Sequence, residues 1–135
     1  MMEAYLVPER TRVTAKGDGA AVDLSAAKGR IFLATLAITD IIEQESLDVS
    51  LWGSADGQNW GQKSLAAFPQ LFYRGEAPLL ADLTAHPEIK FLRAHWEVAR
   101  WGRGEPTPMF VFQVTLKEVP PEVMKEVATA AAARR

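Results

Sequence analysis

The side chains best suited to bind a ligand in this sequence are aromatic rings and arginines that follow one another closely. Trp101 lies between Arg100 and Arg103, and Tyr73 directly precedes Arg74. Aromatic faces and guanidinium groups bind sugars and protein partners, and both residue types are enriched at interface hot spots. We expect Trp101 to be exposed and central to a ligand-binding surface. The alternative is that Arg100 and Arg103 stack on Trp101 only to stabilise its loop.

A run of acids offers oxygen ligands of the kind that calcium prefers. These acids are Asp40, Glu43, Glu45 and Asp48. Their spacing is not that of an EF-hand loop, and a polar bend between two strands explains them better. We therefore expect no metal at this segment.

Groups suited to catalysis are otherwise sparse. The chain has no cysteine, which excludes a nucleophilic thiol, a disulfide and a thiolate metal site. His86 precedes a proline in an expected loop and His95 lies on the expected wet face of a strand, so both are interpreted as solvated. A hydrolase would need convergent acids, such as Asp48 and Glu97, across a cleft. We expect neither an enzyme nor a cofactor.

Residues 46–60, SLDVSLWGSADGQNW, predict a β-strand that ends in a tight turn. Apolar side chains recur at every second position, at Leu47, Val49 and Leu51. Side chains alternate between the two faces of a strand, so this pattern favours one buried and one wet face. The side chains expected on the wet face are those of Asp48, Ser50 and Trp52. The segment therefore indicates an antiparallel sheet.

The turn that follows this strand contains Asp56 and Gly57. This dipeptide suits a reversal in which one residue has a positive φ. We expect Asp56 to stabilise the turn through side-chain hydrogen bonds and Trp60 to fold back onto the sheet.

Turn signals divide the rest of the chain into further apolar segments. The expected strands are residues 6–16, 20–24, 30–39, 72–75, 91–100 and 109–116, with a turn at 17–19. Residues 30–39 are apolar on both faces, which fits a central strand or a buried helix, and Ile31, Phe32 and Thr35 favour the strand. Alternation places two further sets inward: Leu92, Ala94, Trp96 and Val98, then Phe110, Phe112, Val114 and Leu116. The pattern predicts an all-β, antiparallel β-sandwich that is jelly-roll-like.

The C-terminal tail has a different character from the rest of the chain. After two prolines comes EVMKEVATAAAARR, which is rich in helix formers and carries an apolar stripe at Val123, Val127 and Ala131. Such a short helix is marginal alone in water, so we expect it to dock on its own domain or on a partner subunit. The expected organisation is a β-sandwich domain at 1–119 and a helical appendage at 120–135.

Composition excludes several classes of function. The 135 residues are 48% hydrophobic and 24% charged, which is typical of one globular domain with a core of its own. A net charge of -2 gives no basic footprint, so we expect no nucleic-acid partner. We find no signal peptide and no stretch of about 20 apolar residues that would span a membrane. The expected location is cytoplasmic or virion-associated.

Three blocks of the sequence together resemble a known group of proteins. They are TRVTAKGDGAAVDLSAAKGRIFLATLAIT, SLDVSLWGSADGQNW, and KFLRAHWEV with PTPMFVFQVTL. Their order is similar to that in small β-sandwich structural proteins of phages and prophages, and the second block is also similar to a hairpin of discoidin-like jelly rolls. The resemblance covers residues 11–116 and implies a non-enzymatic particle component or binding module. The loop at 101–108 and the C-terminal helix depart from the pattern.

These observations predict a structural or assembly protein of phage-particle type that self-associates. Its expected partners are further copies of itself or other particle proteins. The alternative is a carbohydrate-binding module that uses Trp101, Tyr73 and the nearby arginines to hold a glycan.

Overall fold

The computed structural model describes residues 2–42, 45–100 and 107–120, and in these ranges the protein is built from strands alone. The strands are β1 (Glu3–Val13), β2 (Gly17–Asp18), β3 (Val22–Asp23), β4 (Ile31–Ile41), β5 (Glu45–Ser54), β6 (Ala66–Ala67), β7 (Gly75–Asp82), β8 (Phe91–Arg100) and β9 (Phe110–Glu118). No helix that could cross a membrane occurs among the described residues. The helix expected at 120–135 and most of the loop at 101–108 fall outside these ranges.

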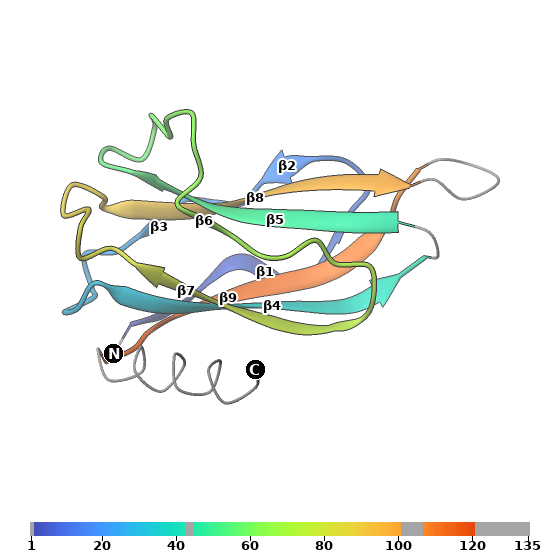
Figure 1. Cartoon of the computed structure of the whole chain (residues 1–135), viewed down its shortest axis with the longest axis horizontal. Coiled ribbons are helices and arrows are strands. Elements are labelled where there is room, and N and C mark those ends of the chain that lie inside the picture. Colours follow the sequence, from blue (N-terminus) through green and yellow to red (C-terminus); the bar gives the residue numbers. More distant parts are fainter. Residues whose placement is uncertain (1, 43–44, 101–106, 121–135) are drawn as a thin grey trace, which may run out of the picture.

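The strands form two antiparallel sheets that lie one over the other (Figure 1). The four-stranded sheet has the order β1-β9-β4-β7. The five-stranded sheet has the order β2-β8-β5-β6, and β3 also pairs with β8. Neighbouring strands in both sheets run antiparallel, which confirms the all-β, sandwich-like arrangement predicted from the sequence.

One hydrophobic core lies between the two sheets and follows the predicted alternation. Leu47, Val49 and Leu51 of β5 are buried, as are Leu92, Ala94 and Trp96 of β8 and the four inward residues predicted for β9. Strand β4 buries Phe32, Ala34, Leu36 and Ile38, whereas the residues between them are half-buried or exposed. Residues 31–41 are therefore a strand, and the helical alternative is wrong.

The strand predicted at 72–75 is wrong, because β7 begins only at Gly75. Phe72 and Tyr73, which suggested a strand, are 37% and 77% exposed and lie in the preceding loop. Pro78 lies within β7 and lacks an N–H, but β7 is an edge strand with only one hydrogen-bonded neighbour. The edge position explains why a proline is tolerated in a strand.

The turn predicted at 17–19 is also wrong, since Gly17 and Asp18 form β2 and pair with Trp96 and His95. Gly17 and Gly19 allow the backbone to pack closely against neighbouring atoms. A Cβ atom on Gly17 would lie 2.9 Å from the Trp96 ring, and one on Gly19 would lie 2.3 Å from a backbone oxygen of β1.

Two strand boundaries also differ from the prediction. The first strand spans Glu3–Val13 rather than 6–16, and the second predicted strand, 20–24, shrinks to β3. Pro8 and the positive φ of Arg10, 56°, accompany register shifts between β1 and β9. Strand β1 is an edge strand, where bulges of this kind are common.

Two buried glutamates tie backbone segments together at the ends of strands. Glu118 accepts hydrogen bonds from the N–H groups of Met2 at 3.1 Å and Gly29 at 2.8 Å. These bonds, with Met2 the main cause, lower the pKa of the Glu118 carboxyl. Glu45 is 1% exposed and accepts from Ile42 at 2.9 Å and Met109 at 2.8 Å. Both carboxylates therefore serve the fold, because they accept hydrogen bonds from backbone N–H groups.

The turn after β5 has the predicted chemistry. Gly57 has a φ of 79°. The Asp56 Oδ1 atom accepts hydrogen bonds from the N–H of Gln58 at 2.9 Å, the N–H of Asn59 at 2.8 Å and the hydroxyl of Ser54 at 2.9 Å. These bonds, with Asn59 first, lower the pKa of Asp56 from 3.8 to about 2.

Replacing Glu45 by alanine should destabilise the fold. The substitution leaves the N–H groups of Ile42 and Met109 without their acceptor, so we expect Glu45→Ala to lower the free energy of unfolding by about 2–4 kcal/mol. Urea unfolding measures this value. Glu45→Gln keeps one carbonyl acceptor and should lose less, whereas the control Glu76→Ala on the exposed side of β7 should change stability by less than about 0.5 kcal/mol. Equal losses in all three variants would contradict the role of Glu45.

The charge of Asp56 should make stability depend on acid pH. A carboxyl whose pKa is lower in the folded state stabilises the fold above its unfolded pKa, and this stabilisation is lost as the pH falls through the folded pKa. We expect the Asp56 contribution to fade between about pH 4 and pH 2. In thermal melts, Asp56→Asn should therefore lose less stability across this window than the wild type. A variant with the same pH profile as the wild type would show that the carboxylate charge is unimportant.

Candidate functional site

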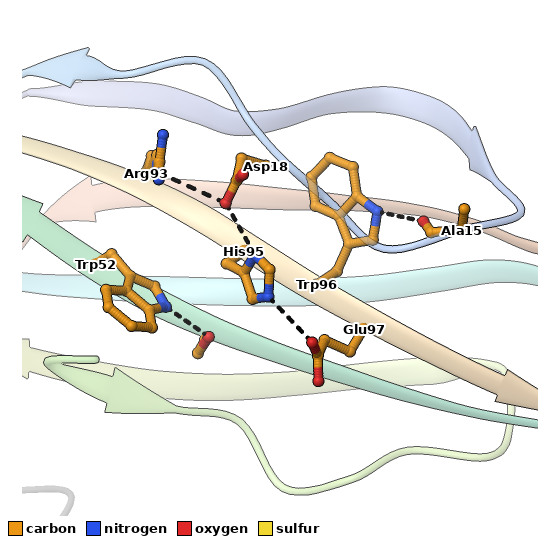
Figure 2. Close-up of polar contacts among 8 residues, drawn as sticks. Ala15, Asp18, Trp52, Arg93, His95, Trp96 and Glu97 are labelled. Carbon is orange, nitrogen blue, oxygen red and sulfur yellow. Dashed lines mark hydrogen bonds and ion pairs between the residues drawn. The ribbon is translucent and has the colours of Figure 1, made fainter. Parts of the chain in front are cut away.

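The outer side of the five-stranded sheet carries a cluster of polar and aromatic side chains that we call the polar face (Figure 2). Strands β5 and β8 pair in register, so their outward residues stand opposite one another. The opposed pairs are Asp48 with Glu97, Ser50 with His95, and Trp52 with Arg93. Asp18 joins them from β2, which pairs with the other side of β8. Three separate segments of the chain thus build one surface.

His95 lies at the centre of the polar face, between two carboxylates. Its Nδ1 atom is 2.8 Å from Asp18 Oδ1, and its Nε2 atom is 3.7 Å from Glu97 Oε1 (Figure 2). Arg93 Nε lies 3.7 Å from the same Asp18 oxygen. The His95 side chain is only 27% exposed. The histidine expected to be merely solvated is therefore held by defined partners, and Asp18 links β2 to two basic groups of β8.

Two tryptophans give the polar face an aromatic component. Trp52 Nε1 donates a hydrogen bond to Ser50 Oγ at 2.9 Å, and the Trp52 ring meets His95 edge-on with centroids 6.3 Å apart. Trp60 folds back onto the sheet as expected, where the guanidinium of Arg93 lies 4.4 Å from its ring centroid. Both indoles are half-buried, so each presents part of its ring to solvent.

A shallow depression of about 300 Å³ lies on this face, bordered by Asp48, Trp52, His95 and Glu97. The sequence left open whether Asp48 and Glu97 are neighbours, and the strand register places them directly opposite each other. Gln70 Nε2 donates a hydrogen bond to Asp48 at 3.0 Å. Both carboxylates are exposed on an open sheet surface, and neither lies in a water-excluding cleft of the kind that supports hydrolysis.

Of the aromatic and arginine residues singled out from the sequence, Tyr73, Arg74 and Arg100 lie elsewhere, at one end of the two sheets. Arg100 is the last residue of β8, and Tyr73 and Arg74 precede β7 at the same end of the molecule (Figure 1). Tyr73 is exposed, whereas Arg74 forms an ion pair with Asp40 at 3.0 Å. The bond from Arg74 is the main cause that lowers the pKa of Asp40. Trp101 and Arg103 lie outside the described residues.

The run of acids does not converge on one point. Asp40 pairs with Arg74, Glu45 is buried against backbone amides and Asp48 faces solvent on the polar face. Glu43 lies outside the described residues. Across 2–42, 45–100 and 107–120, no group of three or more histidine, aspartate or glutamate side chains is placed to hold a metal ion.

Sequence reasoning missed the polar face because its parts come from three strands. Alternation did place Arg93, His95 and Glu97 on one wet face and Ser50 and Trp52 on another. The sequence did not show that β5 pairs with β8, and this pairing joins the two wet faces into one surface. The sequence did not indicate that Asp18 belongs to this face, because the glycines on both sides of it predicted a turn.

The outer side of the four-stranded sheet carries charges at Glu3, Lys117 and Glu76, but one row of its side chains carries none. Tyr5 stands opposite Thr115, Thr115 opposite Thr35, and Thr35 opposite Pro78, so one line of side chains crosses β1, β9, β4 and β7. We call this line the uncharged row. Its members are exposed or half-buried, and none carries a charge.

Comparison with known proteins supplies no function for either surface. No protein-family model matches the chain, and no curated protein matches it. The resemblance to phage structural proteins therefore stays a prediction, and the functional argument rests on the two outer faces described above.

Proposed function

We propose that this chain is a non-enzymatic structural protein that self-associates and serves as a component of a larger, phage-type particle. The observation that carries the proposal is the uncharged row on the four-stranded sheet. Its expected partners are further copies of the chain and other particle proteins, in the cytoplasm or on a virion.

The contrast between the two outer faces supports a contact surface on the four-stranded sheet. The exposed side of an antiparallel sheet is ordinarily polar, as the polar face is. The uncharged row runs across four strands instead, and the neighbouring row, Gln113 opposite Ala37, carries a charge only at its β7 end, at Glu76. Interface centres are depleted in charged residues relative to the rest of a protein surface. A second protein surface that covers this row meets no charged side chain within the row itself.

The order of the strands supports a jelly roll as the detailed fold. The first strand lies beside the last, in the order β1-β9-β4-β7, and the facing sheet reads β3-β8-β5-β6. Among the described strands, the chain passes from one sheet to the other six times: after β1, β3, β4, β6, β7 and β8. Jelly rolls occur in viral capsid proteins and in lectins. This likeness is one of fold alone. It is compatible with a particle component and with a carbohydrate-binding module, and it does not decide between them.

The use of the acidic side chains supports a non-enzymatic role. Glu45 and Glu118 are buried, and both spend their hydrogen-bonding capacity on backbone N–H groups. Asp48 and Glu97 are exposed on an open face. In neither pair do the carboxylates converge on an enclosed pocket that could hold a substrate.

Self-association should be measurable and should depend on the uncharged row. We expect light scattering after gel filtration to give a multiple of the 14.9 kDa chain mass. Thr115→Arg places a charge in the row and should weaken association at least about tenfold. The matched control, Ser50→Arg, places the same charge on the polar face and should leave the mass unchanged. A wild-type chain that stays monomeric at high concentration would contradict the proposal.

A carbohydrate-binding module is the second candidate, and the polar face favours it. Trp52 and Trp60 offer partly exposed rings for stacking on a sugar, and Asp48, His95 and Glu97 offer hydrogen-bonding groups beside them. We therefore propose the outer side of β5 and β8 as a second candidate glycan surface, beside the one that the sequence predicts at Tyr73 and Trp101.

A glycan array compares the two candidate surfaces directly. If the polar face holds a sugar, Trp52→Ala should reduce the bound signal at least about tenfold, because truncating a tryptophan at a binding hot spot costs about 2 kcal/mol or more and about 1.4 kcal/mol is tenfold in affinity. Tyr73→Ala and Trp101→Ala should then leave the signal intact. The reverse pattern would return the site to the residues first indicated by the sequence, and an array with no binding would remove this function.

A further inference from the structure

Strands β1 and β9 form a strip at one side of the four-stranded sheet that has three unusual features. Glu3 stands directly opposite Lys117, so an acid and a base share one row. The next outward row, Tyr5 opposite Thr115, belongs to the uncharged row. A shallow depression of about 450 Å³ lies over these residues. We call these four residues and their depression the β1–β9 strip.

Tyr5 is oriented for contact with another surface. Its side chain is one of the few large apolar groups that stay exposed among the described residues, at 45%. The phenol hydroxyl donates a hydrogen bond to Glu9 Oε1 at 2.6 Å, which fixes the direction of the ring. The same bond is the main cause that raises the pKa of the Tyr5 phenol. A ring that is already oriented loses less conformational entropy when it packs against a partner.

The two charges of the strip are available to a partner. Glu3 and Lys117 are both exposed, and although they are cross-strand neighbours, they form no ion pair with each other in the described structure. A purely acidic or purely basic partner would match only one of them and repel the other. A surface that carries both charges in the same row, in reversed order, would match both.

A second copy of this chain carries such a surface. Consider a two-fold axis that runs parallel to the strands and between β1 and β9. Rotation about this axis places β1 of one copy over β9 of the other and keeps each row in place. Glu3 then faces Lys117 of the second copy, Tyr5 faces Thr115, and each contact occurs twice. Self-complementarity of this kind is what a two-fold interface requires.

We infer that the β1–β9 strip is the place where two copies of this chain meet, across a two-fold axis parallel to the strands. The inference rests on the proposed self-association and adds its location, its symmetry and its pairing of charges. The polar face lies on the other sheet and stays open in such a dimer, free for a further partner.

Reversal of the paired charges tests the inference in the full chain. In sedimentation experiments, Lys117→Glu alone and Glu3→Lys alone each create like-charge contacts, so each should weaken dimerisation at least about tenfold. The double variant Glu3→Lys with Lys117→Glu restores opposite charges across the axis and should recover most of the affinity. Glu76→Lys, a similar reversal on the outward side of β7, is the matched control and should change nothing. Circular dichroism checks that every variant keeps the β fold.

The possible failures of the inference are distinguishable. A wild-type chain that is monomeric overturns the proposed self-association, and the inference with it. A wild-type chain that associates, but whose mass is insensitive to both single reversals, has its interface elsewhere, which overturns the inference alone. If the single reversals weaken association and the double variant does not restore it, the two-fold pairing of Glu3 with Lys117 is wrong.

Discussion

Ten residues of β5 pair with ten residues of β8, from Glu45 opposite Arg100 to Ser54 opposite Phe91, without a break in register. Successive side chains of a strand point to opposite faces, so a shift of this pairing by one residue would exchange the buried and exposed sets of one strand relative to the other. The register keeps Leu47, Val49 and Leu51 over the core. It also opposes Ser50 to His95 and Trp52 to Arg93 on the outside. The register between β5 and β8 therefore determines both the core residues and the polar face.

The buried glutamates close the ends of the structure in a way that hydrophobic packing cannot. Chain segments that leave a sheet carry N–H groups without strand partners, and burying such groups without an acceptor is costly. Glu118 accepts from Met2 and Gly29, which lie far from it in the sequence, and Glu45 similarly holds Met109. These acids therefore connect the start, the middle and the end of the chain.

The two sheets expose different kinds of side chains to solvent. On the five-stranded sheet, Asp18 gathers Arg93 and His95 into a polar network, which suits hydrogen bonding to a small or flexible ligand. On the four-stranded sheet, threonine, tyrosine and proline form a neutral row between rows that carry charges, and a neutral group costs less to desolvate than a charged one. This difference is the basis of our proposal that the protein assembles through the four-stranded sheet and presents the other face. A jelly-roll order of strands would suit this arrangement, since it places the two sheets back to back with both outer faces accessible.

Local sequence patterns by themselves determined four of the longer strands, β4, β5, β8 and β9, and the faces that they bury. The alternation in residues 46–51, 91–100 and 109–116 is a property of neighbouring residues. Each of these strands buries the side chains that its pattern predicted, except that Val98 is only half-buried. The Asp56-Gly57 turn is similarly local, because its hydrogen bonds join residues within a few positions. Residues 72–75 were misjudged because aromatic side chains indicate burial only on average, and Tyr73 is exposed.

Only the tertiary structure decided which strands are neighbours, and with it the composition of both candidate surfaces. Asp18 and His95 are 77 positions apart, and the pairing of β2 with β8 brings them within 2.8 Å. Glu3 and Lys117 share a row only because the first strand lies beside the last. The side-chain period of a strand is set by its own backbone, whereas the choice of partner strand depends on how the whole chain buries its apolar surface. That choice involves contacts between distant residues, which no local pattern encodes.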